Sequence, residues 1–252
     1  MSTPSRSELA ASFAATGEAY DRYRPGFPDA AVDLFADDDV HAALDLGAGT
    51  GKLTERLQGR VAELTAVEPA ESMLAVLRRK LPNVTALLGT AEDIPVADAS
   101  QDLVAVAQAF HWFDTERAAA EIARVLRPGG VLALLWNWPD PHCAWETAAG
   151  AIAHPASAAA RAEEDPDEVP AQADLPGFTT VGAHLVPWPE RISRTDYIER
   201  WATVSSFLAA APDARAEMLA AVERILDEDP DTTGRTELDL PQRTLVLLYR
   251  RP

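Results

Sequence analysis

The sequence is poor in positive charge, and lysine in particular is rare. Its 252 residues contain 22 Lys and Arg against 40 Asp and Glu, which gives a formal net charge of −18 at pH 7. Proteins bind nucleic acids largely by displacing counterions from phosphates with Lys and Arg, so this charge disfavours a nucleic-acid partner. Lys52 and Lys80 are the only lysines. A composition in which Arg supplies most of the positive charge, together with many Ala and Pro, suggests a GC-rich bacterial genome.

Cysteine and long apolar runs are also scarce. Cys143 stands alone, so an intrachain disulfide is excluded, and we expect a small packed residue there. No apolar run reaches the roughly 18 residues that a membrane-spanning helix needs, and residues 1–8 are too polar for a signal peptide. No carboxylate or cysteine lies at ligand spacing from His41, His142, His154 or His184, so we expect no metal site. These absences predict a cytoplasmic protein without a membrane partner, and they leave the oligomeric state open.

The centre of the chain alternates short apolar runs with helical stretches, which is typical of a parallel sheet covered by helices. Strands are predicted at 43–46, 64–67, 84–88, 102–107 and 131–136, and helices at 51–57, 70–80 and 115–126. Further strands are predicted at 178–187 and 244–249, and amphipathic helices at 195–208 and 213–228. We therefore expect one α/β domain of the doubly wound class over residues 1–252.

Residues 139–175 interrupt this alternation. They contain a proline-rich start, an alanine-rich stretch and an acidic segment at 163–168. Such an insertion is either a solvated surface loop or a lid over a pocket. Because like charges repel and apolar periodicity is missing, we expect residues 158–173 to be mobile without a ligand.

Residues 45–51, with the sequence DLGAGTG, follow an apolar strand with three glycines spaced two apart. Glycine lets the backbone turn tightly and approach a ligand where a Cβ atom would collide. A P-loop would need glycine in place of Leu46 and Ser or Thr in place of Leu53, and a dinucleotide fingerprint would need glycine in place of Lys52. Both alternatives fit less well, particularly because Asp45 lies within the strand.

Glu68 ends the next predicted strand, where a carboxylate can accept hydrogen bonds from both ribose hydroxyls. A further strand runs into residues 89–95, with the sequence GTAEDIP. Together with Asp45 and the glycine loop, these segments resemble the class I S-adenosylmethionine-dependent methyltransferases over about residues 20–138. The resemblance implies a seven-stranded, mostly parallel sheet with the order 3-2-1-4-5-7-6, an antiparallel seventh strand, and S-adenosylmethionine as cofactor.

The same resemblance implies roles for individual residues. The glycine loop would surround the methionine part of the cofactor, Glu68 would hold the ribose, Ala91 and Glu92 would frame the adenine, and Met73 would pack on its ring. The full predicted cofactor set is Tyr20, Arg24, Asp45, Gly47, Ala48, Gly49, Glu68, Pro69, Met73, Ala91, Glu92 and Gln108. Most of these residues lie near predicted strand ends, where ligands bind in open α/β sheets.

Three other segments resemble a narrower subgroup that includes trans-aconitate-type methyltransferases of small molecules: residues 20–28 (YDRYRPGFP), 107–113 (AQAFHWF) and 135–138 (LWNW). Tyr20 and Arg24 would close over the cofactor, with the guanidinium placed to meet a carboxylate, although a solvated surface Arg is the alternative. His111 is the candidate general base for an acceptor that must lose a proton, and a structural histidine in an aromatic cluster is the alternative. After Trp138 the chain departs from the subgroup, which often has a charged pair there.

The sequence thus predicts an enzyme that transfers a methyl group to a small organic molecule through a carboxylate, hydroxyl, amine or carbon nucleophile. Three alternatives stay open. The chain could bind the cofactor without transferring its methyl group, methylate a macromolecule, or use the fold for another reaction. The identity of the acceptor does not follow from the sequence.

Overall fold

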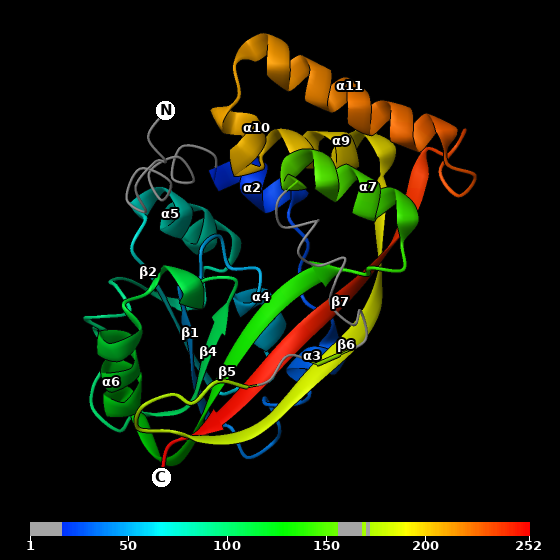
Figure 1. The fold of residues 1–252 in the computed structure, drawn as a ribbon. Helices are drawn as coiled ribbons and strands as arrows, with labels where there is room; N and C mark the ends of the chain where they lie inside the picture. The colour runs from blue at the N-terminus through cyan, green and yellow to red at the C-terminus, as the bar shows by residue number, and fades with distance from the viewer. Residues whose placement is uncertain (1–16, 156–167, 170–171) are drawn as a thin grey trace.

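The computed structural model describes residues 17–155, 168–169 and 172–252, which form one seven-stranded sheet flanked by helices (Figure 1). The strands follow the order β3-β2-β1-β4-β5-β7-β6, which confirms the predicted topology. Their bounds are β1 Ala42–Leu46, β2 Glu63–Glu68, β3 Thr85–Leu88, β4 Gln101–Ala107, β5 Leu126–Pro139, β6 Thr179–Ser193 and β7 Glu237–Arg250.

The first five strands are parallel and carry helices on both faces. All five residues of β1 are buried, as expected for a central strand covered on both sides. Helices α3 (Asp29–Val32), α4 (Thr54–Leu57), α5 (Glu71–Lys80) and α6 (Thr115–Val125) flank this part of the sheet. The chain leaves β1 toward β2 on one side and returns to β4 on the other. The carboxyl ends of β1 and β4 therefore border the crevice where the strand order reverses, which is the usual ligand position in such sheets.

Strands β6 and β7 are longer than the sequence pattern predicts. β7 pairs antiparallel with both β5 and β6, and the β6–β7 ladder continues from Thr179 and Arg250 to Ser193 and Glu237. Pro189 and Pro241 lie opposite each other within that ladder. Proline cannot donate to a ladder, so it interrupts a strand pattern in the sequence even where the chain stays extended.

A layer of helices lies over the far ends of β5, β7 and β6 (Figure 1). We call it the helical layer; it consists of α2 (Gly17–Tyr23), α7 (Ala144–Ala153), α9 (Arg194–Ala202), α10 (Ser205–Ala209) and α11 (Pro212–Glu228). Its core contains Trp145, Tyr197, Trp201 and Phe207, which pack against the end of β7. Cys143 is a free, buried member of the same core, and burial raises the pKa of its thiol to about 11.

Two segments of the helical layer differ from the sequence-based expectation. The predicted helix 195–208 is divided into α9 and α10, because the backbone of Val204 is extended (φ −77°, ψ 139°); the Thr203 hydroxyl donates to the Arg200 carbonyl (2.7 Å) at the end of the first helix. Within residues 139–175, β5 extends to Pro139 and α7 forms an ordered part of the layer. The expected mobility of residues 158–173 falls largely outside the described residues. None of the described helices is long and apolar enough to cross a membrane.

Candidate functional site

The glycine loop turns sharply at the carboxyl end of β1. Gly47, Gly49 and Gly51 have φ angles of +71°, +55° and +88°, in the left-handed region that favours glycine. A Cβ atom on Gly47 would lie 2.8 Å from Cβ of Ala109, so the loop packs directly on the segment that follows β4. The backbone N–H groups of Gly47 and Ala48 both donate to the Val67 carbonyl, at 2.8 and 3.1 Å. The loop is thereby fastened between β2 and the segment after β4.

Glu68 ends β2 and holds the loop from the other side. Its Oε2 accepts from the Gly49 N–H and its Oε1 from the Ala70 N–H, both at 2.9 Å. Burial raises the pKa of Glu68, whereas these two hydrogen bonds lower it. Each carboxylate oxygen has a second lone pair, so the group retains acceptor capacity for two hydroxyl donors.

Asp45 is a buried carboxylate inside β1. Its Oδ2 accepts from the Thr54 hydroxyl at 2.6 Å, and its Oδ1 is buried with no hydrogen-bond partner. Burial raises the pKa of Asp45 to about 7; the Thr54 bond opposes this shift and the charge of Glu68 adds to it. A buried oxygen without a donor is unfavourable and is typical of a ligand-binding position.

Other members of the predicted set border this centre. Met73 is buried at the start of α5, and its Sδ lies 3.8 Å from the Cβ position of Gly49. Ala91 is buried, whereas Pro69 is exposed. The carboxylate of Glu92 accepts from the Asp114 N–H at 2.9 Å and is therefore engaged at the start of α6.

Gln108 follows β4 with a φ of +56°, an unusual conformation for a residue other than glycine. Its backbone N–H donates to the Leu135 carbonyl at 2.8 Å, and its side chain donates to the Asn137 carbonyl at 3.1 Å. Strain of this kind often accompanies functional positions. The structure therefore places Gln108 at the carboxyl end of β4, hydrogen-bonded to the last third of β5.

Asn137 is a residue whose structural role the sequence analysis missed, although it belongs to one of the recognised segments. Its Nδ2 donates to the Gly26 carbonyl at 2.8 Å, and its Oδ1 accepts from the Thr244 hydroxyl at 2.7 Å. It thus connects β5 and β7 to the segment after α2. The only sequence signal for this role is the position of Asn137 next to Trp138 in a recognisable motif.

The segment after α2 brings Arg24 toward the same edge of the sheet. Arg24 is half-buried, and Gly26, two residues later, is held by Asn137. The backbone of Tyr20 lies in α2, but its side chain falls outside the described part of the structure. The predicted closure of both side chains over the cofactor stays a prediction.

His111 lies in a short 3₁₀ turn, η1 (Phe110–Trp112), directly after Gln108 and Ala109. Its side chain is exposed, and its ring centroid lies 5.0 Å from that of Trp112. Phe110 and Phe113 form an edge-to-face pair with a centroid distance of 5.8 Å. The turn therefore presents His111 at the surface beside an aromatic cluster, close in sequence to the point where Ala109 meets the glycine loop.

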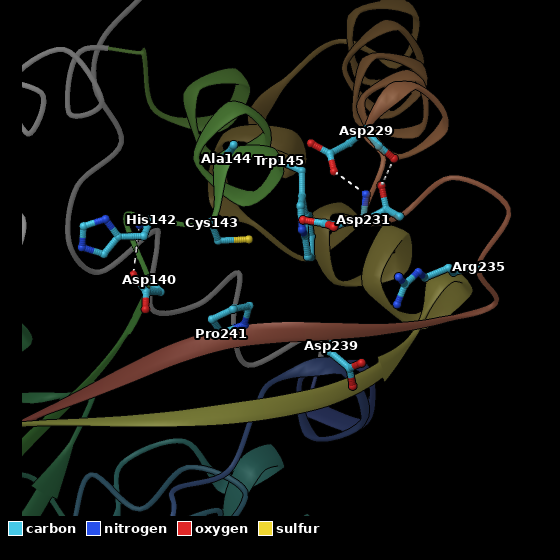
Figure 2. Close-up of a pocket in the computed structure, with 11 residues that line it drawn as sticks. Asp140, His142, Cys143, Ala144, Trp145, Asp229, Asp231, Arg235, Asp239 and Pro241 are labelled. Atoms are coloured by element: carbon cyan, nitrogen blue, oxygen red, sulfur yellow. Dashed lines mark hydrogen bonds between the residues drawn. The ribbon is translucent and has the colours of Figure 1, made fainter.

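A cavity of about 350 Å³ lies below the helical layer, at the far end of β7 (Figure 2). Four of its eleven lining residues are aspartates, and two of these carboxylates, Asp140 and Asp229, are engaged in local contacts. Asp140 accepts from Arg243 (2.9 Å) and from the His142 N–H (3.0 Å), and Asp229 accepts from the Asp231 N–H (2.9 Å). The predicted cofactor residues do not line it. Within the described ranges, no group of three or more His, Cys, Asp or Glu side chains could hold a metal ion.

The residues at the carboxyl ends of β1 and β2 fit S-adenosylmethionine. The buried Asp45 Oδ1 needs a donor, the glycine loop turns in the left-handed conformation that lets a backbone approach a ligand, and Glu68 can accept further hydroxyl donors. Glu68 would hold the ribose, Met73 would pack on the adenine, and Asp45 with the glycine loop would bind the methionine part. The arrangement suits a nucleoside attached to a charged amino acid.

Comparisons with known proteins identify the family. Residues 44–134 match the family described as "Methyltransferase domain". An uncharacterized methyltransferase of Mycobacterium tuberculosis is 41% identical over 246 residues, covering 97% of this chain and 98% of the relative. A malonyl-[acyl-carrier protein] O-methyltransferase of Methylococcus capsulatus is 45% identical over 96 residues, which cover only 36% of this chain and 35% of the relative.

Solved structures show the same architecture. A protein of Anaeromyxobacter dehalogenans, described as a type II methyltransferase, superposes with a TM-score of 0.64 and 26% identity over 90% of this chain and 97% of that chain. The [4+2]-cyclase SpnF superposes with a TM-score of 0.56 and 18% identity over 100% of this chain and 98% of that chain, which is a likeness of fold alone. Because a mycobacterial methyltransferase matches nearly the whole chain, the methyltransferase domain matches residues 44–134 and the sheet has the expected strand order, the chain belongs to the class I S-adenosylmethionine-dependent methyltransferases.

Proposed function

We propose that the methyl acceptor is a small organic molecule and that His111 acts on it. The observation that supports a small acceptor most is the helical layer, which lies over the sheet and is connected to the carboxyl ends of the strands. Asn137 at the end of β5 binds Gly26 after α2, and Arg200 of α9 donates to the Tyr23 carbonyl at 2.6 Å. Strand ends that lie beneath a layer of helices favour a small acceptor over a polymer, because small ligands bind in concave sites.

The charge of the chain supports the same proposal. A net charge of −18 opposes binding of nucleic acid, and the described residues include no separate recognition domain. The O-methyltransferase of Methylococcus capsulatus, as its name states, acts on a malonyl group, but the similarity covers about a third of each chain. A carboxylate acceptor is therefore one of several classes to test. The narrower resemblance to trans-aconitate-type enzymes stays a prediction.

S-adenosylmethionine supplies a methyl group already activated on a sulfonium, so the protein has mainly to align the acceptor and exclude water. His111 follows the strained Gln108 on the same turn, between β4 and α6. A neutral imidazole can remove a proton from a phenol, an amine or a carbon acid. A carboxylate acceptor needs no base, and His111 would then contribute only to binding.

The test begins with a labelled-methyl screen of the purified protein against small acids, phenols and amines. His111→Ala should retain the cofactor affinity of the wild type and lose roughly 100-fold or more in kcat if the imidazole is the base. An unchanged kcat with a raised KM would indicate acceptor binding only. His41→Ala is the matched control. It replaces an exposed histidine next to β1 and should leave kcat and KM unchanged.

Other outcomes would favour the alternatives. Cofactor binding without transfer to any small acceptor would favour a binding protein or a macromolecular substrate. A product without an added methyl group would indicate another reaction on this fold. Loss of cofactor binding together with activity in His111→Ala would assign His111 a structural role in the aromatic cluster.

A further inference from the structure

The two lysines of the chain meet at one point between α2, the glycine loop and α5. Lys80 Nζ donates to Asp21 Oδ1 at 2.6 Å and to the Thr50 carbonyl at 3.3 Å, and it lies 3.2 Å from Glu55 Oε1. Lys52 Nζ lies 3.9 Å from the same Asp21 oxygen. One ammonium group therefore joins α2 to the carbonyl between Gly49 and Gly51.

This cluster is largely shielded from solvent. The side chains of Lys80 and Asp21 are 20% and 21% exposed, so their attraction is screened less than that of a surface pair. Burial lowers the pKa of Lys52, and the charge of Asp21 opposes that shift. A hydrogen bond from a charged donor in such surroundings is stronger than one between neutral groups.

Other contacts of α2 are more exposed or face the helical layer. Glu18 pairs with Arg79 of α5 at 3.1 Å, but these side chains are 81% and 62% exposed. Arg22 pairs with Asp196 of α9 at 3.1 Å. Asp21 is thus the residue of α2 whose ion pairs reach the glycine loop: its partner Lys80 also donates to the Thr50 carbonyl, and Lys52, which directly follows Gly51, lies at the longer distance of 3.9 Å.

We propose that Lys80 and Asp21 are positioning residues for S-adenosylmethionine, because their ion pair fixes α2 against the glycine loop and sets the direction of the Thr50 carbonyl. Loss of Lys80 leaves Asp21 without its 2.6 Å donor and removes the side-chain donor of Thr50 O. The longer contact from Lys52 to Asp21 then remains, so α2 holds the loop less firmly and the cofactor must order both on binding. This inference depends on the cofactor and not on the identity of the acceptor.

The test measures binding of S-adenosylmethionine by calorimetry, without any acceptor. Lys80→Met keeps the length of the side chain and removes its charge, and we expect roughly tenfold weaker binding, as for loss of one charge-assisted hydrogen bond. Asp21→Asn should weaken binding in the same direction. Arg79→Met and Glu18→Gln are matched controls, because they break an α2–α5 pair that does not reach the loop, and they should stay within about twofold of wild type.

Two further measurements separate positioning from general stability. The double variant Lys80→Met with Asp21→Asn should lose little more affinity than either single variant, since both remove one interaction. Hydrogen exchange of the α2 amides should be faster in Lys80→Met, in the free protein and with S-adenosylhomocysteine. Unchanged affinity in a Lys80→Met variant with wild-type melting temperature would overturn the proposal, and so would additive losses in the double variant. If Lys80→Met does not fold, Asp21→Asn decides by the same affinity criterion.

Discussion

Asp45 and Glu68 are buried carboxylates at the ends of adjacent strands, but their hydrogen-bond partners differ. Glu68 accepts one backbone N–H on each oxygen, so its position is determined by the loop it holds. Asp45 accepts from Thr54 on one oxygen and has no partner on the other. The orientation of Glu68 is thus fixed by the protein, whereas Asp45 has unused acceptor capacity.

Replacing Glu68 should weaken binding of S-adenosylmethionine. Glu68→Ala removes an acceptor of the ribose hydroxyls and also frees the Gly49 and Ala70 N–H groups, so we expect a loss of about 1.5–3 kcal/mol in binding free energy. Calorimetry measures this loss, and nicotinamide dinucleotides should not compete. Glu63→Ala, at the exposed start of the same strand, is the control. Equal affinities in the two variants would show that Glu68 does not bind the cofactor.

At the scale of secondary structure elements, a chain of hydrogen bonds joins β6, β7 and β5 to the segment after α2. Trp188 Nε1 donates to the Thr244 hydroxyl at 2.9 Å, this hydroxyl donates to Asn137 Oδ1, and Asn137 Nδ2 donates to the Gly26 carbonyl. Thr244 is fully buried, so each member needs its partner. The segment that carries Arg24 is thereby held by the far half of the sheet.

Breaking this chain at Asn137 should release the segment after α2. Asn137→Asp keeps the shape but removes the donor to Gly26, and we expect faster hydrogen exchange in residues 24–27 and a stability loss of about 1–3 kcal/mol. Thr244→Val removes the hydroxyl on the other side of Asn137 and serves as the comparison. Thr244→Val should lower the free energy of unfolding without the same increase in the hydrogen exchange of residues 24–27. A similar exchange pattern in both variants would contradict the assigned role.

At the scale of the whole molecule, the helical layer contains a buried carboxylate whose ionisation at neutral pH lowers the stability of the folded protein. Glu146 of α7 accepts a hydrogen bond from the Tyr197 hydroxyl of α9. Burial raises the pKa of Glu146 to about 7; the Tyr197 bond and Arg200 oppose this shift, and Glu190 adds to it. In the unfolded chain the group titrates near 4.5.

The sign of the pH dependence follows from these two values. Between about pH 4.5 and 7 the folded protein binds more protons than the unfolded chain, so the contribution of Glu146 to stability is present at low pH and is lost as the pH rises through about 7. Asp45, with a pKa of about 7, acts in the same direction. The free energy of unfolding should therefore decrease from pH 5 to pH 8.

Urea unfolding of variants separates the effect of Glu146 on the pH dependence of stability from the general effect of negative charge. Glu146→Gln should flatten the decrease between pH 5 and 8 by about 1–3 kcal/mol, because the neutral amide does not titrate. Glu199→Gln removes the same charge from the exposed side of α9 and should leave the slope close to wild type. Identical slopes in the two variants would mean that Glu146 ionises normally in the folded protein.

The parallel sheet and the centre of the cofactor site were predictable from local sequence. β1 runs into the glycine loop within a few residues, and Glu68 ends the next strand, so these segments resemble a known family, and that resemblance implies the strand order. The carboxyl ends of parallel strands meet at one edge, which brings these residues together without further information. The sequence by itself therefore determined the alternation of strands and helices and, through the family resemblance of these motifs, the topology and the cofactor.

Only the tertiary structure decided how the helical layer is joined to that sheet. Asp21 meets Lys80 and Gly26 meets Asn137 across long stretches of chain, and within the layer Glu146 meets Tyr197. No local sequence pattern reveals such pairs, because each residue fits its own helix or strand equally well without the distant partner. The length of β6 and β7 was hidden by prolines, which weaken a strand pattern although pairing with a neighbouring strand keeps the chain extended. Packing between distant segments, and not propensity, selects these contacts.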